Sequence, residues 1–311
     1  MFLRRKLTVM ATVALLSTSL LAGCSSSGEN SNGGSNGGGT ATAAEVLANK
    51  NARAAISMII DKQAYCDVIL NNGSIPTSTF TPKGLAFDNG KDYTDLTEGM
   101  GYEYNEEQAK ELWEKAKEEV GFDTVEMELL TYDHDTGKRT GEYIQSELSD
   151  LEGLTVKVSN LPFKQKLERE TNGEFDLAFS GWGADYPDPL TYLSTMQTGN
   201  QFSNQVGYNS EEYNKLIEEA MKLPITEGYA KYAEAEKLML EDGYLAPIYQ
   251  KASAYLEKGY VSGIVNNSWG ADYTYTYADV DKDDKVLNLA TSSDIPTLDL
   301  SKATDQQSFQ T

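Results

Sequence analysis

The residues best suited to binding chemistry lie in one short stretch, Gly181-Trp182-Gly183-Ala184-Asp185. The two glycines leave the backbone open to close approach by a ligand. Trp182 supplies an apolar wall, and Asp185 supplies one fixed negative charge. An ordinary turn after a core strand, with the tryptophan as packing, is the alternative that composition leaves open. The residue types favour a ligand that offers backbone groups and a positive charge.

Catalytic and metal-binding chemistry finds little support elsewhere. His134 is the only histidine, and no Gly-x-Ser-x-Gly elbow accompanies it, so serine-type hydrolysis is not indicated. We interpret His134 as a surface-loop residue. The acidic turn at residues 279–284 has the alternate spacing of a calcium loop, but Asp284 and Ala290 stand where that loop needs glycine and glutamate. The sequence predicts no enzyme, no metal and no cofactor.

Alternating strands and helices must position the binding stretch. Asn105 can cap a helix over residues 106–120, which Gly121 would end. Strands are expected over residues 125–132, 154–161, 175–182 and 246–250. Further helices are expected near residues 141–149, 163–170, 210–221 and 226–240. This order predicts a largely parallel sheet with right-handed crossovers, and ligands of such sheets bind at the carboxyl ends of the strands.

The N-terminus predicts export and lipid anchoring. Residues 4–6 are basic, residues 7–21 form an apolar segment too short to span a membrane comfortably, and Leu-Ala-Gly precedes Cys24 as in a lipobox. An ordinary secretory signal with an incidental cysteine is the alternative. Residues 25–44 are small and polar, which is typical of a flexible tether. Cys66, the other cysteine, is expected to be buried and structural.

The net charge of −22 argues against nucleic acid as a partner, and against polybasic binding to anionic lipid headgroups. At 40% hydrophobic residues, the chain is composed as a folded protein rather than a disordered one.

Residues 180–189 read Ser-Gly-Trp-Gly-Ala-Asp-Tyr-Pro-Asp-Pro, which closely resembles the ligand-clamping segment of the oligopeptide-binding lipoproteins that serve ABC peptide importers. This family is extracellular solute-binding protein family 5, and the resemblance runs from residue 51 to about residue 278. It implies an α/β fold of the type II periplasmic-binding class, mainly the distal lobe with a remnant of the first lobe. It also implies that Asp185 receives the peptide's N-terminal ammonium, while the residues before it flank the ligand backbone.

The C-terminal segment resembles the same family in an unusual order. Residues 285–299 resemble the family's opening strand and turn, and the strand at residues 286–290 is expected to pair with the chain near residues 249–255. Thr304, Asp305 and Gln306 match the first-lobe segment that pairs with the ligand from the opposite side. A circular permutation joined through residues 279–284 and a rearranged gene fragment remain alternative explanations.

The predicted organisation has five parts. A signal peptide (1–23) and a tether (24–44) precede the distal lobe (45–250), a return segment (251–280) and the displaced segment (281–311). The predicted function is extracytoplasmic capture of oligopeptides for an ABC importer, with permease subunits and a lipid-anchored membrane as partners. The alternatives are a peptide sensor or surface lipoprotein without a transport role, or an inactive gene fragment.

Overall fold

A computed structural model of the chain describes residues 39–252, 255–291 and 293–309. The predicted signal peptide, Cys24 and most of the predicted tether lie outside the described residues. No helix within the described ranges is long and apolar enough to cross a membrane.

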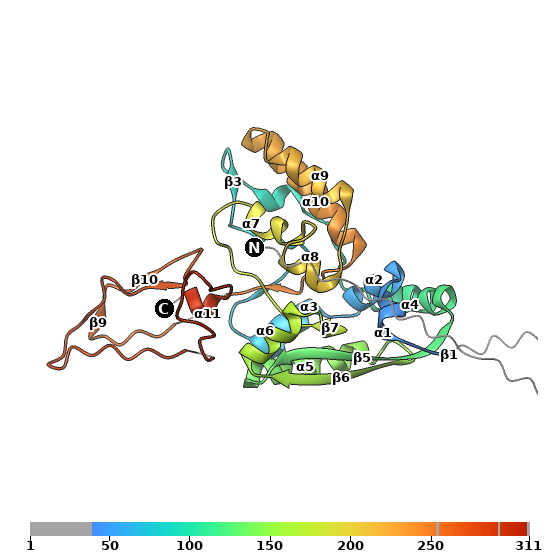
Figure 1. The fold of residues 1–311 in the computed structure, drawn as a ribbon, viewed down its shortest axis with the longest axis horizontal. Helices are drawn as coiled ribbons and strands as arrows, with labels where there is room; N and C mark the ends of the chain where they lie inside the picture. Colours follow the sequence, from blue (N-terminus) through green and yellow to red (C-terminus); the bar gives the residue numbers. More distant parts are fainter. Residues whose placement is uncertain (1–38, 253–254, 292, 310–311) are drawn as a thin grey trace, which may run out of the picture. The chain divides into compact units, whose positions relative to one another are not determined.

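The centre of the fold is a parallel sheet (Figure 1). Its strands are β1 (Gly39–Ala41), β5 (Phe122–Tyr132), β6 (Leu154–Leu161) and β7 (Leu177–Ala178). The long strand β5 pairs in parallel with each of the other three, and β7 pairs near its carboxyl end. The predicted parallel sheet is therefore confirmed.

Strand β7 is much shorter than the predicted strand over residues 175–182. Before β7, the Asp176 carboxylate accepts a hydrogen bond from the Glu128 N–H at 2.8 Å, so a side chain takes the place of a backbone carbonyl as the partner of β5 there. After β7, the Phe179 N–H donates to the Leu130 carbonyl at 2.9 Å, and pairing with β5 ends. The binding stretch therefore lies in irregular backbone just beyond the strand.

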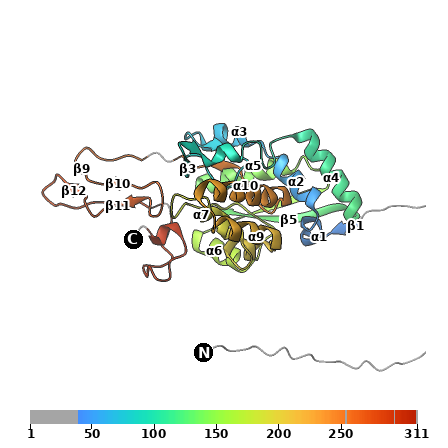
Figure 2. The same cartoon turned by 90° about the horizontal axis from the view of Figure 1, so that it is seen from above.

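Helices pack on this sheet, and the helix predicted over residues 106–120 has its predicted bounds. Asn105 caps α4 (Glu106–Val120) by accepting from the Gln108 N–H, and Gly121 ends α4 with a φ of 83°. Helix α5 (Asp135–Leu148) packs on β5 and β6, and α2 (Lys50–Met58) packs along α4 (Figure 2). Trp113 of α4 is fully buried in the core that these elements share.

A second core is rich in tyrosine and forms around α9 (Glu211–Ala220) and α10 (Ile225–Asp242), which pack against each other. Ser210 caps α9, and Gly243 ends α10 with a φ of 72°. Trp182 packs against this second core, so the binding stretch lies at its surface.

The remaining elements are mostly short. Those before the sheet strand β5 are α1 (Ala43–Leu47), α3 (Lys62–Ala64), η1 (Tyr65–Leu70), β2 (Ile75–Pro76), β3 (Phe87–Asp88), β4 (Lys91–Asp92) and η2 (Tyr93–Leu96). Those after β6 are α6 (Phe163–Thr171), α7 (Leu190–Leu193), η3 (Ser194–Met196), α8 (Gln201–Val206), β8 (Tyr249–Gln250), β9 (Val261–Ser262), β10 (Val265–Asn266), β11 (Tyr273–Thr274), β12 (Asp279–Val280) and α11 (Gln306–Phe309).

His134 is exposed and lies in the loop before α5, so the prediction of a surface-loop residue is confirmed; its Nδ1 also accepts from the Gly137 N–H at 3.0 Å and caps α5. Two predictions are corrected. The strand predicted at residues 246–250 shortens to β8, which pairs antiparallel with β2. The strand predicted at residues 286–290 does not form, and no described partner strand lies against it. The expectation that Cys66 is buried is confirmed, and burial raises the pKa of its thiol.

Candidate functional site

The candidate site is the ligand-facing backbone, which we define as residues 181–184, together with Asp185. The N–H groups of these four residues form no hydrogen bond with any other described residue. A Cβ built on Gly181 would meet nothing within 4 Å, and a Cβ built on Gly183 would meet only Gln306 Oε1, at 3.6 Å. Unpaired N–H groups on an accessible segment can pair with another extended chain.

Neighbouring residues nevertheless fix the course of this backbone. The Tyr192 hydroxyl donates to the Trp182 carbonyl at 3.2 Å, and the Asp185 N–H donates to Thr191 Oγ1 at 2.9 Å. Both partners lie on α7, which begins directly after Pro189. The Ala184 carbonyl accepts from the Gly270 N–H at 2.8 Å. These bonds hold two carbonyls, those of Trp182 and Ala184, and the N–H of Asp185, and they leave the N–H groups of residues 181–184 free.

Trp182 combines the two roles that the sequence left open. Its ring packs edge-on against Phe202, with 5.6 Å between ring centroids and an interplanar angle of 79°. Its Nε1 is buried and has no hydrogen-bond partner among the described residues. The tryptophan is thus part of the second core and also an apolar wall beside the open backbone.

Asp185 carries a carboxylate without a cation. The residue is exposed overall and takes part in no ion pair with another described residue. Partial burial of the carboxyl group raises its pKa, and a hydrogen bond with Thr191 opposes that effect in part. A nearby positive charge would lower the pKa again and stabilise the carboxylate. The geometry therefore suits a cationic ligand group.

Of the three C-terminal residues matched to the ligand site, Gln306 lies close to it. Gln306 Nε2 donates to the Gly270 carbonyl at 2.8 Å, and a Cβ built on Gly183 would lie 3.6 Å from Gln306 Oε1. Asp305 is buried, and its carboxylate caps α11 by accepting from the Ser308 N–H at 3.0 Å and from its hydroxyl at 2.8 Å. Gln306 therefore meets the ligand-facing backbone, whereas the Asp305 carboxylate is occupied by the helix cap.

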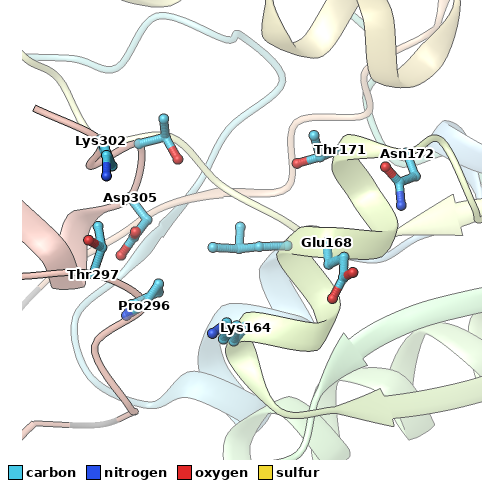
Figure 3. Close-up of a pocket in the computed structure, with 10 residues that line it drawn as sticks. Lys164, Glu168, Thr171, Asn172, Pro296, Thr297, Lys302 and Asp305 are labelled. Carbon is cyan, nitrogen blue, oxygen red and sulfur yellow. The ribbon is translucent and has the colours of Figure 1, made fainter. Parts of the chain in front are cut away.

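A cavity of about 320 Å³ lies beside Asp305, between α6 and the segment at residues 296–305 (Figure 3). Lys164 and Glu168 line it from α6, and Thr297 and Thr304 line it from the C-terminal segment. Thr304 thus lines this cavity.

Sequence reasoning missed several residues that shape the site. Thr191 and Tyr192 hold the backbone through α7, and Lys166 and Glu170 contact Ser180 from α6. An i, i+4 lysine–glutamate pair usually marks a solvated helix face, so its burial gives no sequence signal.

Comparison with known proteins places this fold. A family model described as bacterial extracellular solute-binding proteins, family 5 Middle, matches residues 28–204. The chain is 31% identical to a dipeptide-binding protein of Lactococcus lactis over 238 residues, which cover 74% of this chain and 43% of that protein. It is 28% identical to the periplasmic oligopeptide-binding protein OppA of Salmonella typhimurium, covering 68% of this chain and 38% of that protein.

Solved structures of oligopeptide-binding proteins have a similar fold. The substrate-binding domain of an oligopeptide ABC transporter from Bacillus anthracis superposes with a TM-score of 0.73 and 36% identity. OppA of Listeria monocytogenes, solved bound to peptide, superposes with a TM-score of 0.71 and 36% identity. In both cases the match covers 76% of this chain and 46% of the other, so the chain spans less than half the length of these relatives. The fold is α/β of the type II periplasmic-binding class, and the chain belongs to the bacterial extracellular solute-binding proteins of family 5, a family of binders rather than enzymes.

Proposed function

We propose that this chain takes part in the extracytoplasmic capture of oligopeptides for an ABC importer. Membership of a solute-binding family supports this, as do relatives named for dipeptide and oligopeptide binding. The partners would be the peptide and the permease subunits of the importer.

The observation that carries the proposal is the run of unpaired N–H groups at residues 181–184 beside the cation-free carboxylate of Asp185. A binder indifferent to side chains must hold what all peptides share, which is the backbone and the charged ends. Pairing of the ligand backbone with residues 181–184 would meet the first need, by strand addition. Asp185 would meet the second by accepting hydrogen bonds from the ligand's N-terminal ammonium.

We propose further that the remaining half of the family fold completes the site. Beyond residue 250, Val280 is the only buried core hydrophobic among the described residues. The same region holds more than half of the exposed large apolar side chains, including Leu256, Leu298 and Leu300. Exposed apolar surface of this kind is typical of a face that another structured part covers. A full family fold would also supply the opposite wall of the cleft.

The N-terminal segment adds a location to the proposal. The lipobox-like sequence before Cys24 would attach the mature chain by a lipid to the outer face of the cell membrane. A tethered binder stays close to its permease, which raises its effective concentration there.

Calorimetric titration with short peptides tests the proposal. The chain is titrated alone and again after addition of the lobe of a relative that lies outside the matched region. We expect binding of peptides with a free N-terminus, strengthened by the added lobe, and much weaker binding of N-acetylated forms. Absence of binding under both conditions would contradict the proposed function.

A further inference from the structure

Helix α6 carries a buried ion pair next to the point where the ligand-facing backbone begins. Lys166 and Glu170 lie one helical turn apart, and their side chains are 0% and 4% exposed. The Lys166 ammonium contacts the Glu170 carboxylate and lies 4.3 Å from the centre of the Tyr132 ring. Burial lowers the pKa of Lys166, and the Glu170 charge opposes that effect.

Stability alone does not account for such a pair. Removing two charges from water costs about as much as their attraction returns, so apolar replacements of similar size are often neutral or stabilising. Buried charge pairs can instead fix one specific arrangement of the groups around them.

Ser180 connects this pair to the ligand-facing backbone. The Lys166 ammonium donates to Ser180 Oγ at 2.8 Å, and Ser180 Oγ donates to Glu170 Oε1 at 2.5 Å. Ser180 stands between Phe179, whose N–H makes the last bond to β5, and Gly181, whose N–H is unpaired. The hydroxyl therefore anchors the residue at which the strand gives way to the open segment.

We propose that Lys166 and Glu170 are positioning residues for ligand binding, because they hold residues 181–184 through Ser180. This inference rests on the proposed function and names residues that carry it. Two of the four residues are glycines, so an unanchored segment would sample many conformations. Ser180 fixes one end, and the bonds from α7 fix the other. Less conformational freedom would then be lost when a peptide pairs with the segment.

The first test uses hydrogen exchange in the chain without ligand. Ser180→Ala removes the hydroxyl and leaves Lys166 and Glu170 paired with each other. Its matched control is Ser159→Ala, because Ser159 Oγ also donates to a carboxylate at 2.5 Å, on Glu128 in the same sheet. Ser180→Thr restores the hydroxyl.

We expect amide exchange at Phe179 to accelerate about tenfold in Ser180→Ala, and to stay within about twofold in the control and in Ser180→Thr. Equal exchange at Phe179 in all four proteins would overturn the proposal. The double variant Lys166→Met with Glu170→Leu should accelerate the same amide without lowering the urea midpoint of unfolding. A lowered midpoint with unchanged local exchange would instead assign the pair a purely structural role.

The second test measures peptide affinity by calorimetry under the conditions given above. Ser180→Ala should weaken binding of free-amine peptides about 3- to 30-fold, while Ser159→Ala should leave it unchanged. Unchanged affinity in Ser180→Ala would refute the link to ligand binding. If the unmodified chain binds no peptide, the proposed function fails, whereas the exchange result at Phe179 still decides whether the pair positions this backbone.

Discussion

Lys62 offers a test of the packing through the pH dependence of stability. Its side chain is buried, with the residue 3% exposed, and its ammonium donates to Ser78 Oγ at 2.9 Å and to the Tyr102 carbonyl at 2.5 Å. No described carboxylate forms an ion pair with it. Burial lowers the pKa of Lys62 from 10.5 to about 8, although Glu103 raises it slightly.

The sign of the effect follows from proton binding. Between pH 8 and 10.5, the folded protein holds neutral Lys62 while the unfolded chain holds it protonated. The unfolded state then binds more protons, so the free energy of unfolding rises with pH across this window. Below pH 8 the charge is present in both states, and folding must bury it. The contribution of Lys62 to the free energy of unfolding therefore rises by about 2 kcal/mol between roughly pH 7.5 and 9.5.

Urea unfolding of the protein and of Lys62→Met at several pH values measures this contribution. The difference between the two free energies of unfolding isolates the lysine, because tyrosines and Cys66 titrate equally in both proteins. We expect that difference to shift by about 2 kcal/mol in favour of the unmodified protein as pH rises. Lys215→Met, at an exposed lysine, should show no such shift. A flat difference for Lys62→Met would refute the reasoning.

Three further predictions concern the core and the membrane anchor. Glu236→Gln should lower the free energy of unfolding by about 2–4 kcal/mol, measured by urea unfolding. The buried carboxylate accepts four hydrogen bonds, and the NH₂ group of a glutamine would face two of those four donors. Gly141→Ala should lower the free energy of unfolding by about 1–3 kcal/mol in the same assay, because the new Cβ would lie 2.6 Å from Val158 Cγ1. Glu142→Ala, the control at the exposed neighbouring residue, should leave the free energy of unfolding nearly unchanged. Cys24→Ala should move the exported protein from the detergent phase to the aqueous phase, and unchanged partitioning would contradict lipid attachment.

Local sequence signals predicted the elements whose ends are marked by single residues. Helix α4 begins after Asn105 and ends at Gly121 as expected, and β6 covers the predicted residues 154–161. The strand at residues 175–182 was overestimated because the Asp176 side chain, rather than the backbone, bonds Glu128 before β7, and the Phe179 N–H makes the last described backbone bond to β5. The strand at residues 286–290 was expected from resemblance, but a strand needs a neighbour, and none of the described segments pairs with it.

The burial of the Glu236 and Lys166 charges could not be predicted, because it depends on residues elsewhere in the sequence that cover or bond them. Glu236 reads as one of many helical glutamates, yet it accepts from the Phe80 and Thr81 N–H groups more than 150 residues away. Lys166 likewise reads as a surface lysine until Ser180 and Tyr132 close over it. The candidate site could be proposed from the sequence because two glycines, a tryptophan and an aspartate lie within residues 181–185, and its role in binding stays a prediction.

We propose that Asp185 selects the free N-terminus of a peptide, and removing its charge tests this most directly. Asp185→Asn keeps the shape and removes the charge, while Asp95→Asn serves as a control at an exposed aspartate remote in sequence. Calorimetry would compare each variant with free-amine and N-acetylated forms of one peptide, with the remaining lobe of a relative added if the chain alone is inert. We expect Asp185→Asn to weaken free-amine binding by about 2–5 kcal/mol and to leave the weak binding of the acetylated form unchanged. Equal losses for both forms, or no loss for either, would show that Asp185 is only a structural turn residue.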